Sequence, residues 1–265
     1  MGKVYFVGAG PGSADLITVR GAKALAQAEV VLFDALADPA LRDLAPLACW
    51  LDVGKRGFVH AHKQDSINAM LVRAAHEHEF VVRLKGGDPS IFGRLEEELE
   101  ALAAAGIDCE VVPGVTAALA AAAASKRPLT RRGSGRSVAF STAMTQSGEL
   151  RAARSADSEV FYMAGRQLAA LSRQLLQASW PAGTPVCVVS RAGWPDQLIS
   201  DHRVGTLALA AVLHAGRPTV VTVGAAACGV SAATAPARTI AATAPDTRPS
   251  RGTVMPPASK RIESI

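Results

Sequence analysis

The chain has 265 residues, of which 49% are hydrophobic and 19% are charged, and its formal net charge is +5 at pH 7. This profile is typical of a soluble α/β protein with one large or two small domains. It excludes a transmembrane protein, because no apolar run reaches the roughly 18 residues that a membrane-spanning helix needs.

Cysteine and histidine usage gives no sign of a metal site. The four cysteines are widely spaced and form no CxxC pair, and the two HxH pairs, at 60–62 and 76–78, have no further ligands at a suitable spacing. We therefore expect no metal. The N-terminus enters a strand pattern without a signal peptide, so we expect a cytoplasmic protein.

Short apolar runs alternate with helical segments along the first half of the chain. The runs lie at 4–7, 30–33, 50–53, 80–84 and 109–112. Helices are predicted at 18–27, 64–77 and 95–105, and an alanine-rich helix is predicted after Thr116. This alternation predicts βαβ units and a mostly parallel sheet.

The second half follows a basic, turn-rich segment and predicts a smaller α/β domain with a mixed sheet. Strands are expected near 137–141, 159–163, 185–190, 198–204 and 219–223, and helices at 165–178 and 206–214. The predicted organisation is an N-terminal domain at 1–126, a basic linker at 127–136 and a C-terminal domain at 137–225. The remainder, 226–265, has no aromatic residue, and we expect a disordered tail.

Unusual loops follow the strands of the first half. They lie at 8–12, 54–56, 86–89 and 113–116, and Asp34 ends the second run. The carboxyl ends of parallel strands meet at one edge of the sheet, where ligands bind. Adjacent glycines there let a ligand approach the backbone, although a tight turn would favour the same residues.

The loop "GAGPGS" at 8–13 resembles part of a dinucleotide fingerprint. However, the third glycine is missing, and Pro11 removes a backbone N–H that a pyrophosphate would need. Asp34 could still bind a ribose, so a dinucleotide remains an alternative. A P-loop is excluded. A ligand with an adenosine and no phosphate, such as S-adenosylmethionine, fits Gly86, Gly87, Asp88 and Thr116 better.

Several longer motifs together resemble one family. They are "VYFVGAGPGSADLITVRG", "VVLFDAL", "DVGKRG", "VVRLKGGDPSIFGR", "VVPGVTAA", "PLTRRG" and "VFYMAG". Across about residues 3–224 the chain resembles the tetrapyrrole (precorrin-type) methylases, and among them the enzymes that act on uroporphyrinogen III. The resemblance implies two α/β domains with an active-site cleft between them, and a homodimer. It also implies transfer of two methyl groups from S-adenosylmethionine, giving precorrin-2 and S-adenosylhomocysteine.

The resemblance also assigns roles to individual residues. Asp34 and Lys55 match the proposed acid/base pair. The residues that match cofactor-contacting positions are Pro11, Gly86, Gly87, Asp88, Ile91, Thr116, Ala117 and Met163, with Ala192 at a position where the family often has glycine. The substrate is an anionic tetrapyrrole with eight carboxylates, and cations are expected to neutralise them. The candidates are Arg56, His60, Arg131 and Arg132, with Lys126, Arg127 and Arg136 nearby.

Structural roles remain possible for several of these residues. Asp34 could cap the next segment, Lys55 and Arg56 could be solvated, and Met163 could be core packing. The chain also departs from the family pattern, with "FGRLEEE" in place of "FGRGGEE" and "STAMT" in place of a "TGH" motif. Another precorrin methylase, or a non-catalytic tetrapyrrole-binding homologue, therefore stays an alternative. No nucleic-acid partner is expected, because the basic residues are not interleaved with aromatic ones.

Overall fold

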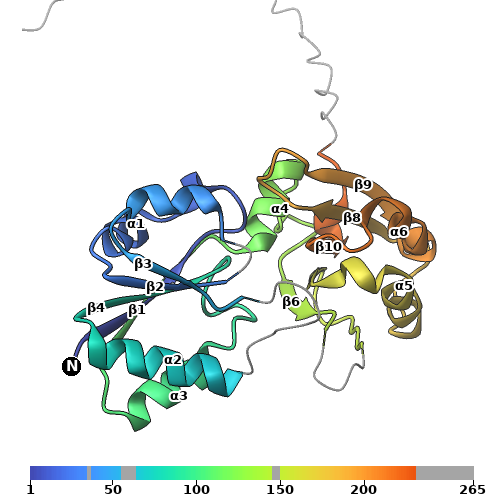
Figure 1. Cartoon of the computed structure of the whole chain (residues 1–265). Helices are drawn as coiled ribbons and strands as arrows, with labels where there is room; N and C mark the ends of the chain where they lie inside the picture. The colour runs from blue at the N-terminus through green and yellow to red at the C-terminus, as the bar shows by residue number, and fades with distance from the viewer. Residues whose placement is uncertain (35–36, 55–63, 145–149, 231–265) are drawn as a thin grey trace, which may run out of the picture. The chain divides into compact units, whose positions relative to one another are not determined.

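The first half of the chain forms a parallel sheet from the five apolar runs. The computed structural model describes residues 1–34, 37–54, 64–144 and 150–230, and Met1–Val230 form one compact unit (Figure 1). Within these residues the sheet has the order β3-β2-β4-β1-β5. Its strands are β1 (Lys3–Gly8), β2 (Val30–Phe33), β3 (Cys49–Asp52), β4 (Phe80–Lys85) and β5 (Cys109–Val112).

Helices cover both faces of this sheet because successive side chains of a strand point to opposite faces. Phe6, Leu32 and Val81 pack with α2 (Gln64–Glu77) and α3 (Leu95–Ala104). Their neighbours Val7, Val31 and Val82 pack on the other face with α1 (Val19–Leu25) and the 3-10 helix η2 (Pro39–Leu44). Burial on both faces explains why these strands read as continuous apolar runs.

The second half forms a mixed sheet with the order β6-β7-β10-β8-β9. Its strands are β6 (Val138–Thr142), β7 (Ser158–Tyr162), β8 (Pro185–Ser190), β9 (Leu198–Arg203) and β10 (Thr219–Gly224). The β6–β7 pair is parallel, and the remaining pairs are antiparallel. The helix α4 (Ala117–Ser125) packs on one face, and α5 (Leu168–Gln177) and η4 (Val204–Ala210) pack on the other.

The predicted fold class is confirmed, with a parallel sheet in the first half and a mixed sheet in the second. Two helices differ in detail. The helix expected at 206–214 is mostly the 3-10 helix η4, continued by the short α6 (Ala211–His214). The helix expected from 165 begins at Leu168, after the 3-10 turn η3 (Ala164–Arg166). There Gly165 packs so closely that a Cβ atom would lie 2.3 Å from the carbonyl oxygen of Arg217.

The domain limits predicted from the sequence, at 126/127 and 136/137, are not tested by the structure and stay a prediction. The helix α4, assigned by sequence to the first domain, packs against the second sheet. The short helices η1 (Ala14–Leu16) and η5 (Ala225–Ala227) complete the elements of the described residues. Most of the predicted tail, residues 231–265, lies outside these residues. None of the described helices has the length and apolar character required to cross a bilayer.

Candidate functional site

The loops after β1 and β4 are joined by backbone hydrogen bonds between two glycines. The amide of Gly87 donates to the carbonyl oxygen of Gly10 at 2.7 Å, and the amide of Gly10 donates back at 3.3 Å. Both residues have positive φ, 78° at Gly10 and 74° at Gly87. Glycine adopts this conformation without the cost that a Cβ atom brings. These residues therefore bring the two loops together at the carboxyl edge of the sheet.

The loop after β5 joins the same edge through close backbone packing. A Cβ atom on Gly114 would lie 2.3 Å from the carbonyl oxygen of Gly87, so only glycine fits there. The carboxylate of Asp88 accepts hydrogen bonds from the amides of Gly114 and Ser90, both at 2.8 Å. The three loops that the sequence predicted at one edge are thus joined to one another by close packing and by hydrogen bonds to backbone amides. The glycines serve this packing as well as leaving space for a ligand.

These loops form part of the wall of a cavity that the second sheet completes. The structure brings all nine predicted cofactor-binding residues to this wall. From the first sheet come Pro11, Gly86, Gly87, Asp88 and Ile91. From α4 and the second sheet come Thr116, Ala117, Met163 and Ala192. A Cβ atom on Gly87 would meet nothing closer than 4.0 Å, so this glycine leaves open space beside the backbone.

Aromatic side chains that the sequence analysis did not single out also line the cavity. Phe92 and Tyr162 meet edge to face with ring centroids 5.0 Å apart, and Trp194 lies 4.4 Å beneath the guanidinium of Arg191. Burial raises the pKa of the Tyr162 phenol. Phe92 and Tyr162 belong to the family motifs "DPSIFGR" and "VFYMAG", so these motifs could have identified both residues as part of the site. Asp88 and Arg191 are the charged residues of this lining, and Arg191 pairs with Asp196 at 2.7 Å.

The backbone is strained at three positions of the cavity wall. Phe92, Met163 and Arg191 have φ angles of 52°, 57° and 51°, in the left-handed region. For a residue with a Cβ atom this conformation costs about 1–2 kcal/mol. Such strain clusters at ligand sites, where the surrounding structure enforces it. The exposed side chain of Met163, 42% accessible, is also not explained by core packing.

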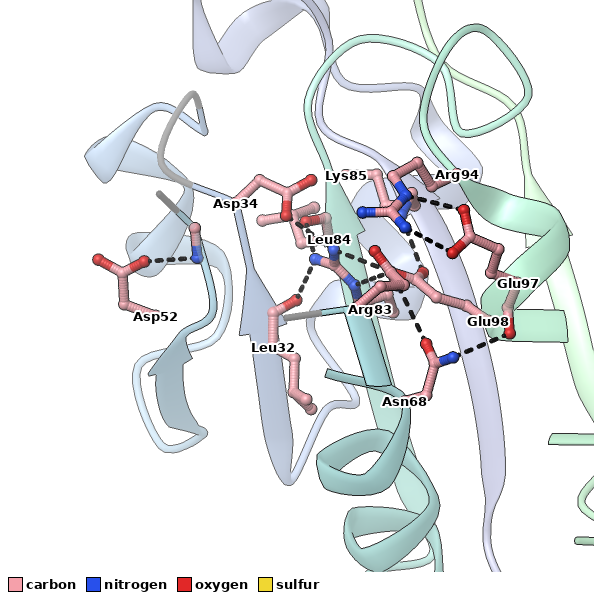
Figure 2. Close-up of polar contacts among 12 residues, drawn as sticks. Leu32, Asp34, Asp52, Asn68, Arg83, Leu84, Lys85, Arg94, Glu97 and Glu98 are labelled. Carbon is pink, nitrogen blue, oxygen red and sulfur yellow. Dashed lines mark hydrogen bonds and ion pairs between the residues drawn. The ribbon is translucent and has the colours of Figure 1, made fainter. Parts of the chain in front are cut away.

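The predicted acid/base and substrate residues are placed only in part. Asp34 follows β2 at the same edge of the sheet but does not line the cavity, and its carboxylate accepts a hydrogen bond from Arg83 at 2.7 Å (Figure 2). Lys55, Arg56 and His60 lie outside the described residues. Arg131 and Arg132 do not line the cavity.

The basic segment before β6 is folded against other parts of the chain. Arg131 pairs with Gly135 through two backbone hydrogen bonds of 2.7 and 3.0 Å, and its guanidinium donates to the carbonyl oxygen of Cys228. Arg127 forms an ion pair with Asp201. Arg132 is exposed.

The fold and the cavity define an α/β protein with a largely apolar pocket for a small molecule at the carboxyl edge of a parallel sheet. Residues 3–208 match the sequence profile of the Tetrapyrrole (Corrin/Porphyrin) Methylases, and the chain belongs to this family.

Relatives of the chain include enzymes and solved structures of the same family. A uroporphyrinogen-III C-methyltransferase from Synechocystis sp. is 41% identical over 237 residues, which are 85% of this chain and 89% of that protein. The crystal structure of uroporphyrin-III C-methyl transferase from Thermus thermophilus, complexed with S-adenyl homocysteine, has a TM-score of 0.75 and 35% identity and covers 85% of this chain and 98% of its own. The cobalamin biosynthetic enzyme cobalt precorrin-4 methyltransferase has the same TM-score at 30% identity, with coverage of 85% and 96%.

Proposed function

We propose that the chain is an S-adenosylmethionine-dependent C-methyltransferase that converts uroporphyrinogen III to precorrin-2 by two successive methyl transfers. The product would supply sirohaem, cobalamin or haem d1 synthesis. One observation carries the proposal: nine residues chosen from the sequence as cofactor contacts line a single cavity. The Synechocystis relative, which is named for this activity and aligns over 85% of the chain, supports it.

The cavity wall suits an adenosine derivative without phosphates. It offers aromatic rings and open backbone, and its charged side chains are one carboxylate and one guanidinium that is already paired with Asp196. A dinucleotide would require donors for two phosphates, whereas Pro11 has no backbone N–H to give. We therefore favour S-adenosylmethionine over NAD or FAD, with S-adenosylhomocysteine as its product.

S-Adenosylmethionine, when bound, supplies a methyl group on a positively charged sulfur. The aromatic and aliphatic walls of the cavity would keep water from this group. When a pyrrole carbon has gained the methyl group, the ring system is a delocalised cation that must lose one proton. We assign the role of proton acceptor to Asp34, with Lys55 as its acid partner. Both assignments come from the family resemblance.

The substrate contacts, the oligomeric state and the compartment are parts of the proposal. Arg56, His60, Arg131 and Arg132 are our candidates for binding the carboxylates of the tetrapyrrole. Arg132 is exposed, whereas the guanidinium of Arg131 contacts the carbonyl group of Cys228. A homodimer in the cytoplasm follows from the family resemblance and from the sequence prediction.

The test is anaerobic incubation of the protein with uroporphyrinogen III and S-adenosylmethionine labelled in the methyl group. We expect a product that retains the label and whose mass has risen by two CH2 units, because each methyl group gained replaces a proton lost. S-Adenosylhomocysteine should bind in calorimetry. A folded protein that binds S-adenosylhomocysteine but methylates only a later precorrin would favour another family activity. Binding without turnover on any tetrapyrrole would indicate a non-catalytic homologue.

A further inference from the structure

Four charged side chains form a connected network around β4. Arg83 and Lys85 come from β4, Glu98 from α3, and Asp34 from the end of β2 (Figure 2). The side chains of Arg83, Lys85 and Glu98 are 3%, 3% and 1% exposed, whereas that of Asp34 is 31% exposed. Burial of three charged groups in a small core is costly, and residues of this kind rarely lie there without a specific partner.

Strand periodicity places these groups on one face of the sheet. Val81 and Leu32 belong to the face that α2 and α3 cover, so Arg83, Lys85 and Asp34, two or four positions further along, point to the same face. In the β2–β4 register Leu32 lies opposite Arg83. A slip of one residue in β4 would turn Arg83 away from both Glu98 and Asp34.

Every N–H group of the Arg83 guanidinium has an acceptor. The Nε and Nη2 atoms donate to Oε1 of Glu98 at 3.2 and 3.1 Å. The Nη1 atom donates to the carbonyl oxygens of Leu32 and Leu84 at 3.4 and 3.2 Å. The second Nη2 hydrogen is donated to Oδ1 of Asp34 at 2.7 Å. A guanidinium has five N–H donors in a fixed plane, so four bonds inside the protein fix the direction of the fifth.

The three buried groups of this network are two cations, Arg83 and Lys85, and one anion, Glu98, so one positive charge has no buried counterpart. Glu98 is shared between two cations, since its Oε2 also accepts a hydrogen bond from Nζ of Lys85 at 2.8 Å. Burial lowers the pKa of Lys85, and the neighbouring Arg83 cation lowers it further. The Asp34 carboxylate supplies the second negative charge at the exposed end. A buried cation without a compensating charge would be strongly destabilising, so the contact between Arg83 and Asp34 balances the charge of the network.

We propose that Arg83 is a positioning residue that orients the Asp34 carboxylate at the edge of the sheet, with Glu98 and Lys85 fixing Arg83 in turn. The inference rests on the proposed function, in which Asp34 accepts the proton released after methyl transfer. Arg83 binds Oδ1 at 2.7 Å, and we assign Oδ2 as the oxygen that accepts the proton. The amide of Asp34 is bound to the carbonyl oxygen of Leu84 at 3.3 Å, the same oxygen that accepts from Arg83, so the backbone and the side chain are fixed by one strand.

The test is a double-mutant cycle with Arg83→Gln and Asp34→Asn in the full chain. A positioned general base contributes about 10²–10⁴-fold to a rate, so we expect each single variant to lower kcat by at least about 10²-fold. The affinity for S-adenosylhomocysteine and the KM for S-adenosylmethionine should stay within about threefold of wild type, because neither residue lines the cavity. Because Arg83 acts through Asp34, the double variant should be no slower than the slower single variant.

Arg83→Lys provides the conservative comparison if Arg83→Gln folds poorly. Lysine retains the charge, so we expect Arg83→Lys to recover at least tenfold of the activity lost in Arg83→Gln, or, where Arg83→Gln does not fold, to stay within tenfold of wild type. Three results would overturn the inference while leaving the proposed function standing. These are losses that multiply in the double variant, wild-type kcat in a folded Arg83→Gln, or, where that variant does not fold, a kcat of Arg83→Lys more than tenfold below wild type. A wild-type protein that binds S-adenosylhomocysteine but releases no methylated product would overturn both.

Discussion

The hydroxyl group of Thr116 lies 2.8 Å from the phenolic oxygen of Tyr162. Thr116 precedes α4, which follows the last strand of the parallel sheet, and Tyr162 ends β7 of the mixed sheet. Both side chains are buried, at 8% and 7% exposure, and both residues line the cavity. One hydrogen bond therefore connects segments that are 46 residues apart at the site where we place the cofactor.

Removal of both partners of this pair should cost less than the two single removals added together. Thr116→Val and Tyr162→Phe each leave a buried hydroxyl without its partner, and we expect each to lower the free energy of unfolding by about 1–3 kcal/mol. The double variant should cost clearly less than the sum of the two. Urea denaturation measures this, with Tyr5→Phe as the control, since that ring stacks on Phe80 and should lose less than about 0.5 kcal/mol. Additive losses would show that the two hydroxyls are not coupled.

Gly87→Ala should weaken cofactor binding as well as stability. The φ angle of Gly87 is 74°, and an added methyl group would enter the open space beside the cavity wall. Gly106 is a matched control, because its φ angle is 68° and nothing lies within 4 Å of an added Cβ atom. Each variant should lose about 1–2 kcal/mol of stability. Only Gly87→Ala should also lose about tenfold or more in S-adenosylhomocysteine affinity, measured by calorimetry. Equal affinities in the two variants would contradict our placement of the cofactor.

Two adjacent glutamates of α3 should differ sharply in their contribution to stability. Glu98 is buried and pairs with Arg83 and Lys85, so Glu98→Gln would leave two buried cations without their shared anion. We expect a loss of about 3–5 kcal/mol. Glu97 pairs with Arg94 at the surface, with side chains 44% and 53% exposed, so Glu97→Gln should cost less than about 1 kcal/mol. Thermal unfolding of the two variants side by side tests this difference, and equal losses would refute it.

A buried histidine near the cavity predicts how stability depends on pH. The Thr219 hydroxyl donates to the carbonyl oxygen of Arg217, so it must accept from Ser190, which in turn must accept from Nδ1 of His214. The Nε2 atom of His214 lies 2.8 Å from the Ser200 hydroxyl, which is also 2.8 Å from Nε2 of His202. A neutral ring with its proton on Nδ1 satisfies both contacts of His214. Burial lowers the pKa of His214 below its ordinary value, and His202 and Arg217 lower it further.

The sign of the pH effect follows from this lowered pKa. As the pH falls through about 6.5, His214 takes up a proton in the unfolded chain before it does so in the folded protein, so stability decreases. We expect the drop in Tm between pH 7.5 and 5.5 to be larger in wild type than in His214→Gln. The exposed His76 gives the control His76→Gln, which should keep the wild-type drop. An identical drop in His214→Gln and wild type would show that His214 does not titrate in this way.

Local sequence patterns were sufficient for the strands and for the first-sheet part of the site. The strand Pro185–Ser190 was predicted at its observed limits, and Phe80–Lys85 was extended by one residue in the structure. These strands are predictable because a continuous run of apolar residues indicates a strand buried on both faces, and an alternating run indicates a strand buried on one face. The glycines of the loops were also recognisable, since positive φ and close backbone packing exclude other residues.

Other parts of the site depend on residues far apart in the sequence. Nothing in the strand "FVVRLK" indicates that Arg83 meets Glu98, fifteen residues later, or Asp34, forty-nine residues earlier. Trp194 reaches the cavity through the packing of the second sheet, and its own neighbours carry no motif. The helix expected at 206–214 became a 3-10 helix for most of its length, because packing overrides a weak helical pattern.

The sequence by itself determined the elements, their order and the glycine-rich edge, because each of these follows from the residue's own conformational and burial preferences. Only the tertiary structure decided which side chains share the cavity and which charges meet between β4, α3 and the end of β2. The physical reason is that a contact between distant segments depends on strand register and helix packing, which no single segment encodes.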